Sequence, residues 1–297
     1  MHLCDMDERM PLVSVAVITY NSSKYVLETL ESIKAQTYKN IELIISDDCS
    51  KDNTMQLCKD WCDQNKNRFV RIQVIEPEKN TGVTANCNRA EAACEGDWVK
   101  LIAGDDLLLP DCIETYISYV NIHTDVVYVF AKVRIFGGDE ERKKFWDTFF
   151  IYDFFNWTIE EQYDFLTLKR NCIPAGSMLY NREKSNALGI ENDERIPLLE
   201  DWPRWINLLK HGVRFHFIDK ETVLYRLSEN ALSTGHSQSP AYLKSYSKVY
   251  KYYCFKNDCK KGWRRKAIHK YMEGEIIIHN NSFIWRVISK LYEKLFL

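Results

Sequence analysis

Long apolar runs are absent from this sequence of 297 residues. A helix that crosses a bilayer needs about 20 consecutive apolar residues, and no run approaches that length, so we expect no transmembrane helix. The first residues lack the basic and then apolar order of a secretory signal peptide, which favours a cytoplasmic location. Internal repeats and low-complexity tracts are also missing. The composition, with 45% hydrophobic and 28% charged residues, is that of an ordinary globular protein and excludes disordered and collagen-like classes.

The ten cysteines form no metal or disulfide signature. They make no CxxC pair, no histidine stands near them at a zinc-like spacing, and a chain of this size does not depend on disulfides. Cys58 and Cys62 lie four residues apart, on one face of an expected helix. We therefore interpret the cysteines as small buried hydrophobic residues.

Charge is unevenly distributed, although the net charge is only −2. Residues 241–297 carry thirteen Lys or Arg against four Asp or Glu, which leaves the rest of the chain near −11. No DNA- or RNA-binding motif accompanies this charge, so an anionic phospholipid surface or an acidic partner is favoured over nucleic acid. Apolar residues at helical spacing in Phe283–Phe296 fit either packing on the rest of the chain or docking on a membrane.

Apolar, β-branched runs alternate with helical patterns in the first third of the chain. The expected strands are 12–18, 41–45, 70–75 and 98–102, and the expected helices are 25–33, one capped by Ser50 or Asp52, and 85–94. A βαβαβαβ order with short connections predicts an α/β fold with a doubly wound, mostly parallel sheet, right-handed crossovers and helices on both faces.

The pattern changes from about residue 112. We expect one more helix, strands near 126–133 and 177–180, an irregular aromatic-rich stretch at 145–157, and a helix from about residue 200. Beyond residue 239 the pattern is almost entirely helical. These boundaries predict one α/β domain at 11–238, divided into halves at 11–111 and 112–238, and a helical C-terminal extension at 239–297.

Two acidic pairs, Asp47-Asp48 and Asp105-Asp106, directly follow apolar runs. Strands that are apolar throughout are buried on both faces, and their carboxyl ends open into the crevice where parallel sheets bind ligands. Carboxylates gathered in one crevice require a cation or a polyol as partner, and a metal-bridged sugar diphosphate supplies both.

The segments near the first pair suit a nucleotide. Tyr20 could present its ring to a flat base, and Asp48 could accept a hydrogen bond from a ring N–H such as that of uracil, whereas Asp47 is expected to hold the Ser50 turn. Amide side chains and backbone N–H groups in 80–89 would lie at a helix start, which suits an anionic or ribose-bearing ligand, although alone this is only a capped helix.

The second pair, Asp105-Asp106, suits a divalent cation. Mg²⁺ and Mn²⁺ take hard oxygen ligands, few of them from protein, and keep positions open for phosphate oxygens. One carboxylate can anchor the metal while its neighbour binds ribose. The dipeptide alone is weak evidence, but its place between a buried strand and Leu107–Pro110 strengthens it.

A third pair, Glu200-Asp201, precedes a helical pattern. Acidic residues are common in a first helical turn because of the helix dipole, so the simplest interpretation is a helix start. If this helix faces the crevice, Asp201 can instead remove a proton from an incoming hydroxyl as a general base. Trp202, directly beside it, is the tryptophan best placed to stack on a sugar ring.

Taken in order, these segments resemble the inverting family 2 glycosyltransferases with a GT-A fold. The match spans about residues 11–235 and consists of 15–21, 44–54, 80–90, 103–110, Glu200-Asp201-Trp202 and Tyr225-Arg226 with Ser233. The resemblance implies that Asp48 recognises the base, Asp105 binds ribose, Asp106 binds Mn²⁺ or Mg²⁺, and Asp201 is the catalytic base. The remaining expected donor-site residues are Thr19, Tyr20, Asn80, Gly82 and Asn88.

The resemblance also implies an activity. A sugar, of hexose type, would pass from a nucleoside diphosphate, with UDP favoured, to a hydroxyl of a glycan or lipid-linked acceptor in bacterial surface polysaccharide synthesis. Residues 11–111 would bind the nucleotide sugar and 112–238 would form the acceptor side, where Pro174–Ser177 resembles an acceptor-facing loop. Residues 239–297 could bring the enzyme to the inner face of the membrane, and the oligomeric state stays open.

The sequence departs from the family pattern at three places. Many members carry Asp-x-Asp-Asp where this chain has Ala103, so one carboxylate is missing. Cys87 replaces a common arginine, and whether Arg89 compensates is open. Ser228 stands where a histidine is frequent, which weakens a phosphate contact from that loop.

Two alternatives remain at this level. A catalytically silent partner subunit that binds sugar nucleotides would tolerate Ala103, although retention of Asp48, Asp105, Asp106 and Asp201 favours an enzyme. A nucleotidyltransferase would need a basic or glycine-rich loop after the first strand, and Thr19–Ser23 contains neither arginine nor glycine.

Overall fold

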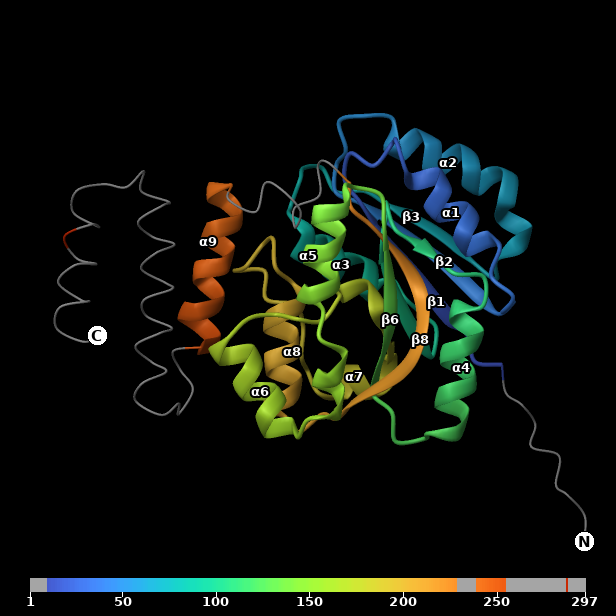
Figure 1. Cartoon of the computed structure of the whole chain (residues 1–297). Helices are drawn as coiled ribbons and strands as arrows, with labels where there is room; N and C mark the ends of the chain where they lie inside the picture. The colour runs from blue at the N-terminus through green and yellow to red at the C-terminus, as the bar shows by residue number, and fades with distance from the viewer. Residues whose placement is uncertain (1–9, 229–238, 255–286, 288–297) are drawn as a thin grey trace, which may run out of the picture.

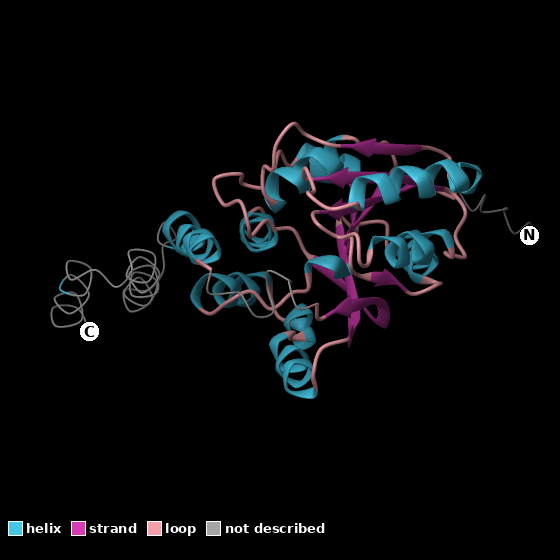
Figure 2. Ribbon diagram, turned by 90° about the horizontal axis from the view of Figure 1, so that it is seen from above, coloured by secondary structure: helices cyan, strands magenta, loops and turns pink. Residues whose placement is uncertain are grey.

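An eight-stranded sheet with helices on both faces forms the centre of the molecule (Figures 1 and 2). The computed structural model describes residues 10–228, 239–254 and 287. Within these residues the strands lie in the order β3-β2-β1-β4-β7-β6-β8-β5. The mixed α/β architecture expected from the sequence is therefore confirmed.

The first half is the parallel part of the sheet. Its strands are β1 (Val13–Thr19), β2 (Ile41–Asp47), β3 (Ile72–Ile75) and β4 (Trp98–Ala103), and its helices are α1 (Val26–Lys34), α2 (Thr54–Asn65) and α3 (Val83–Ala92). β1 lies between β2 and β4 and pairs in parallel with both, and β2 pairs in parallel with β3. Every residue of β2 is buried, as expected for a strand covered on both faces.

The second half adds antiparallel pairs. Its strands are β5 (Leu107–Leu108), β6 (Tyr128–Phe136), β7 (Met178–Asn181) and β8 (Phe215–Arg226). β7 pairs antiparallel with β4 and β6, β5 pairs antiparallel with β8, and β6 pairs in parallel with β8. The sequence patterns did not predict β8, because Asp219, Lys220 and Glu221 interrupt its apolar character.

Two apolar clusters cover the two faces of the sheet. Alternate side chains of β1 enter different clusters, since Val15 and Val17 belong to one and Ala16 to the other. The first cluster includes residues of α1, α2, α4 (Cys112–Ile122) and α5 (Glu140–Phe149). The second includes residues of α3, α6 (Ile159–Leu168), α8 (Asp201–Lys210) and α9 (Pro240–Val249).

Shorter elements complete the described chain. They are α7 (Arg182–Ala187), 3₁₀ turns at Lys66–Arg68, Tyr152–Asn156 and Ala175–Ser177, and a π-helical turn at Tyr250–Cys254. The eight cysteines within the described ranges are free thiols, and seven of them are buried. This agrees with their interpretation as small apolar residues.

Two local expectations were wrong. Helix α2 begins after Asn53 as its N-cap, and not after Ser50 or Asp52. The aromatic stretch expected to be irregular contains α5, because Asp139 caps that helix by accepting a hydrogen bond from the Arg142 amide at 2.8 Å. Acidic residues in the first turn of α5 favour the helix further.

The beginning of the C-terminal extension packs on the α/β domain. Trp202 of α8 and Tyr246 of α9 contact each other, with ring centroids 5.3 Å apart, and Figure 1 shows α9 beside α8. The apolar stripe expected at Phe283–Phe296 lies outside the described residues apart from Val287. In the part of the chain that the structure describes, every helix is too short or too polar to cross a bilayer.

Candidate active site

A cavity of about 820 Å³ opens at the carboxyl ends of β1, β2 and β4. The residues that line it at these ends are Thr19, which ends β1, Tyr20, which follows it, Asp48 after β2, and Asp105-Asp106 after β4. The opposite walls come from the segment before β7, the start of α8, the end of β8, and α9. The cavity brings together Thr19, Tyr20, Asp48, Asn80, Gly82, Asp105, Asp106 and Asp201.

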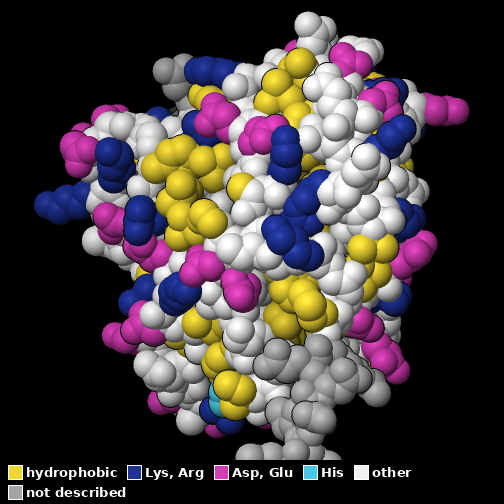
Figure 3. Space-filling model, turned by 90° about the vertical axis from the view of Figure 1, so that its right-hand side faces the viewer, with side chains coloured by type: hydrophobic (Ala, Val, Ile, Leu, Met, Phe, Trp, Pro, Cys, Tyr) yellow, Lys and Arg dark blue, Asp and Glu magenta, His cyan; other side chains and the backbone are white. Residues whose placement is uncertain are grey.

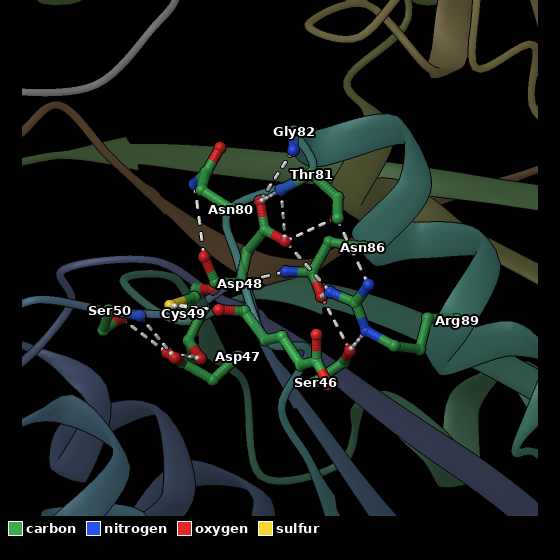
Figure 4. Close-up of polar contacts among 12 residues, drawn as sticks. Ser46, Asp47, Asp48, Cys49, Ser50, Asn80, Thr81, Gly82, Asn86 and Arg89 are labelled. Atoms are coloured by element: carbon green, nitrogen blue, oxygen red, sulfur yellow. Dashed lines mark hydrogen bonds and ion pairs between the residues drawn. The ribbon is translucent and has the colours of Figure 1, made fainter.

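The two aspartates after β2 point away from each other (Figure 4). Asp47 is completely buried and accepts hydrogen bonds from the Thr19 hydroxyl at 2.8 Å and from the Ser50 amide at 2.7 Å. Its carboxylate therefore fixes the turn between β2 and α2, as expected from the sequence. Asp48 instead faces the loop that precedes α3.

The Asp48 carboxylate already makes hydrogen bonds and an ion pair within the protein. Its carboxylate accepts from the Thr81 amide at 3.0 Å, the Thr81 hydroxyl at 2.6 Å and the Gly82 amide at 2.7 Å, and it forms an ion pair with Arg89 at 3.0 Å. A carboxylate offers about four acceptor positions. A hydrogen bond from a nucleotide base to Asp48, as the sequence led us to expect, would therefore require one of these donors to move.

Arg89 supplies the positive charge that is missing at Cys87. Cys87 is buried in the apolar layer, whereas Arg89 reaches the Asp48 carboxylate and donates to Ser46 at 3.1 Å. Arg89 also donates to the side-chain oxygen of Asn86 at 2.8 Å. The positive charge at Asp48 thus comes from a position of α3 two residues further along the chain than the family pattern suggested.

The loop before α3 is fixed by a glycine. Gly82 has φ of 90°, and a Cβ atom built there would lie 2.9 Å from the carbonyl oxygen of Pro197. A larger residue would thus be strained and would push this loop away from Asp48. Asn80 also ties the loop to β2, because its side chain donates to the Asp48 carbonyl at 3.2 Å.

Tyr20 and Thr19 present different surfaces to the cavity. The Tyr20 side chain is 47% exposed, so its ring is open to a planar ligand, whereas Thr19 is buried and its hydroxyl is used by Asp47. Asn88, another expected donor residue, instead lines a second, shallow hollow and donates to the carbonyl of Asn192 at 3.0 Å. Asn88 therefore lies outside the lining of the main cavity, whereas Asn86 is part of it.

Asp105 and Asp106 are held by Arg226 at the end of β8. The Arg226 amide donates to Asp106 at 2.8 Å, and its guanidinium donates to the Asp105 carbonyl at 2.6 Å and pairs with Glu28 at 2.7 Å. Burial raises the pKa of Asp105, and burial together with the charge of Asp105 raises the pKa of Asp106 well above its ordinary value. The ionised form of the pair is therefore poorly solvated, and a nearby cation would stabilise it.

The chemistry of this pair fits a divalent cation. Two adjacent, shielded carboxylates gain from a positive partner, and their oxygens are the hard ligands that Mg²⁺ and Mn²⁺ prefer. Among the described residues no group of three or more His, Cys, Asp and Glu forms a complete metal cage. Such a site leaves coordination positions for phosphate oxygens, and exposed Ala103 beside it adds no ligand.

Asp201 opens α8 with its carboxyl group in the cavity wall. One oxygen accepts from the Asn171 side chain at 2.7 Å and the other accepts from the Trp202 amide at 2.7 Å. Burial raises the pKa of Asp201 to about 6, and burial together with the charge of Asp201 raises the pKa of Glu200 to about 8. Asp201 is thus a carboxylate near neutral pH with raised basicity.

Trp202 does not have the exposed face that sugar stacking requires. Its side chain is only 1% exposed, and its indole N–H donates to the carbonyl of Leu166 at 2.9 Å. Trp205 is also buried. The expected stacking role of Trp202 was therefore wrong, since this residue belongs to the apolar layer beneath α8.

A buried ion pair joins α8 to α3. Arg204, three residues after Asp201, pairs with Glu91, and its guanidinium lies 4.7 Å from the ring centroid of Tyr180 and 5.5 Å from that of Tyr128. The sequence patterns did not predict the partners of Arg204, Asn171 or Arg226, because these partners are distant along the chain. A charged residue on an otherwise apolar helix face was the one available hint.

Comparisons with known proteins point to one family of enzymes. The model of glycosyl transferase family 2 matches residues 14–189. An uncharacterized glycosyltransferase of Methanocaldococcus jannaschii is 27% identical over 95% of this chain and 86% of its own length. TuaG of Bacillus subtilis, named as a candidate teichuronic acid biosynthesis glycosyltransferase, is 26% identical over 76% of this chain and 82% of its own length.

Solved structures share the fold. TarS of S. aureus (residues 1–349) in complex with UDP-GlcNAc has a TM-score of 0.64 with 19% identity, covering 89% of this chain and 72% of that chain. The mannosyltransferase PcManGT of Pyrobaculum calidifontis, in complex with GDP-Man and Mn²⁺, has a TM-score of 0.62 with 14% identity, covering 95% and 84%. The chain therefore belongs to glycosyl transferase family 2, and it is a glycosyltransferase with the GT-A fold.

Proposed function

We propose that this enzyme transfers a sugar from a UDP-sugar to an acceptor hydroxyl with inversion at the anomeric carbon. The observation that carries the proposal is that Asp201 lines the same cavity as Asp105 and Asp106. A single displacement needs a general base for the attacking hydroxyl and a group that binds the leaving diphosphate, and this cavity holds a candidate for each.

The donor would lie along the carboxyl ends of β1, β2 and β4. Its base would stack on the exposed ring of Tyr20, next to the loop that Asp48 holds through Thr81 and Gly82. Asp105 would bind the ribose and Asp106 would hold Mn²⁺ or Mg²⁺. The cation, when bound, would neutralise charge on the leaving diphosphate. We favour UDP because the similar TarS structure contains UDP-GlcNAc. GDP is the competing nucleotide, since the PcManGT structure contains GDP-Man.

Asp201 would act as the general base in the reaction. Its carboxylate would take the proton of the acceptor hydroxyl as that oxygen bonds to the anomeric carbon, while the bond to the diphosphate oxygen breaks and its electrons leave with the nucleotide. Asn171 would orient the carboxylate through its 2.7 Å hydrogen bond. Burial makes Asp201 a better base than an exposed aspartate, since its pKa is about 6.

The acceptor would be a glycan or a lipid-linked sugar used in building a surface polysaccharide. The name of TuaG, which refers to teichuronic acid biosynthesis, supports this setting. A cytoplasmic location, with residues 239–297 against the membrane, is part of the same proposal and draws on the basic charge of that segment. The alternative of a silent partner subunit is not favoured, because the base and the diphosphate-binding pair are all retained.

A donor panel tests the proposal. The full chain would be incubated with UDP-, GDP- and dTDP-sugars and Mn²⁺, and release of the nucleoside diphosphate would be measured. We expect release from UDP-sugars above that from the other two classes, and a β-linked product from an α-linked donor by NMR. Retention of configuration would contradict single displacement, and binding without release from any donor would favour the silent subunit.

A further inference from the structure

The active-site cavity has a wall that no donor residue occupies. Tyr242 and Tyr246 of α9 line the same cavity as Asp201. Residues four apart lie on one face of a helix, and these two rings are nearly parallel, with an interplanar angle of 24° and centroids 6.4 Å apart. Helix α9 thus presents a two-ring aromatic face to the reaction centre.

This face is supported from behind. Tyr246 packs against buried Trp202 and against Tyr250, with both ring centroids 5.3 Å away, and its hydroxyl lies 3.3 Å from that of Tyr250. Both Tyr242 and Tyr246 remain partly exposed, unlike Trp202 and Tyr250. The inner rings fix the position of the outer ones, which leaves the open sides of Tyr242 and Tyr246 for a ligand.

Tyr242 lies close to the proposed base. Burial raises its pKa to about 12, and the negative charges of Asp201 and Glu200 contribute to that rise. Because Tyr242 and Asp201 line one cavity, a molecule that lies on Tyr242 would be held on the Asp201 side of that cavity, where an acceptor hydroxyl must be placed.

The aromatic rings of Tyr242 and Tyr246 favour one class of acceptor. A pyranose ring has an apolar C–H face and polar edges, which suits tyrosine rings that combine an apolar face with a hydroxyl. The acidic groups that interact with Tyr242 are Asp201 and Glu200, and the ionised Asp201 carboxylate would repel a lipid phosphate. Lys24, Arg170 and Arg226 also line the cavity, so a lipid phosphate is the competing ligand class. Arg170 donates through Nη1 to the carbonyls of Phe149 at 2.7 Å and Asn171 at 3.0 Å, and Arg226 pairs with Glu28.

We propose that Tyr242 and Tyr246 form the acceptor subsite and hold a neutral sugar ring by stacking, so that the acceptor end is a glycan. The proposal rests on the proposed function, because it takes Asp201 to be the base. It assigns the start of the C-terminal extension to the active site, whereas the sequence pattern suggested only a helical appendage.

Saturation-transfer NMR on the full chain tests this subsite. The probes are the methyl glycosides of glucose, galactose and N-acetylglucosamine, with farnesyl phosphate as the competing class, all in the presence of UDP and Mn²⁺. We expect signals on the pyranose C–H protons in the wild type, and Tyr242→Ala or Tyr246→Ala to weaken glycoside binding about three- to tenfold, as for loss of one aromatic contact. Tyr242→Phe and Tyr246→Phe should keep the signals, because the rings remain.

A matched control lies on the neighbouring turn. Tyr252 stacks on Arg195 at 4.5 Å and lies outside the cavity lining, so Tyr252→Ala should leave glycoside binding unchanged. The Kd for UDP with Mn²⁺, measured by calorimetry, should be the same in all variants. Unchanged glycoside signals in both alanine variants, or binding of farnesyl phosphate and of none of the glycosides, would overturn the subsite while leaving the donor site intact. Absence of UDP binding in the wild type would instead overturn the proposed function, and the subsite with it.

Discussion

Asp201 carries the clearest prediction at the scale of single residues, because a general base must be ionised to accept a proton. Burial raises its pKa to about 6, so the active fraction falls as the pH drops through that value. We expect kcat/KM for sugar transfer to fall about tenfold per pH unit below pH 6 and to level off above about pH 7. Steady-state rates between pH 5 and 8 would measure this profile, and a flat profile would contradict the assignment.

Replacing the same residue removes the base while keeping its shape. Asp201→Asn should lower kcat by at least about 100-fold and leave UDP binding intact, which is the usual size of effect for a lost general base. Asp164→Asn, at an exposed position of α6, is a matched control that should keep full turnover. Unchanged turnover in Asp201→Asn would rule out this residue as the base.

A substitution at Asp106 tests the proposed metal site. Asp106→Ala should abolish the part of UDP binding that depends on Mn²⁺, because the proposed carboxylate ligand is lost. Calorimetric titration of UDP with and without Mn²⁺ would measure it. If wild-type protein binds UDP equally well with and without Mn²⁺, the proposed metal site is wrong.

The sequence predicted the positions of these aspartates better than their contacts. Asp48 and Asp106 follow buried strands, and parallel strands always end at one edge, so their gathering was predictable. The engagement of Asp48 by Arg89 was not, because it depends on how α3 is rotated. The same uncertainty explains why Asn88 was expected where Asn86 lies, since residues two apart point to opposite sides of a helix.

At the scale of elements, the ion pair between Arg204 and Glu91 joins α8, which carries the proposed base, to α3, which borders the proposed donor site. Arg204→Met should lower the free energy of unfolding by about 3–5 kcal/mol, because the mostly buried Glu91 carboxylate loses its cation and keeps only a hydrogen bond from Asn192 at 3.3 Å. The double variant Glu91→Leu with Arg204→Met should recover much of this loss, since neither charge remains. Chemical denaturation would measure both.

A surface pair supplies the control for this experiment. Arg134 and Glu221 form an ion pair between β6 and β8 with both side chains largely exposed, so Arg134→Gln should change stability little. Equal effects of Arg204→Met and Arg134→Gln would show that the buried pair does not hold the two helices together.

Strands and helices with one hydrophobic pattern along their whole length were predictable from the sequence, whereas elements that combine buried and exposed stretches were not. The apolar runs of β1, β2 and β4 are visible because both faces of these strands are buried. Strand β8 has buried residues on both sides of an exposed, charged middle and a partly buried C-terminal end, so no single periodicity describes it. Helix α5 has one buried residue among ten, Trp146, and its only strong sequence signal is the Asp139 cap.

At the scale of the whole molecule, charge separates the C-terminal end from the rest. Figure 3 shows a side of the molecule on which acidic and basic side chains alternate around small apolar groups, as on an ordinary solvated surface. The basic excess lies instead in residues 241–297. Since α9 forms part of the cavity wall, a membrane-binding role of the residues that follow would bring the active site to the surface where lipid-linked acceptors lie.

Liposome co-sedimentation of the full chain tests this role. We expect binding to vesicles with anionic phosphatidylglycerol and little binding to neutral phosphatidylcholine vesicles, with a steep loss at high salt. Reversing four basic residues, Lys260, Lys261, Arg264 and Arg265, to glutamate should weaken binding at least about tenfold, since each basic residue contributes about 1 kcal/mol at an anionic surface. These substitutions leave α9 intact, so UDP binding serves as the control for folding. Equal sedimentation of wild type and variant would exclude an electrostatic membrane anchor in this segment and would leave an acidic protein partner as the explanation of its charge.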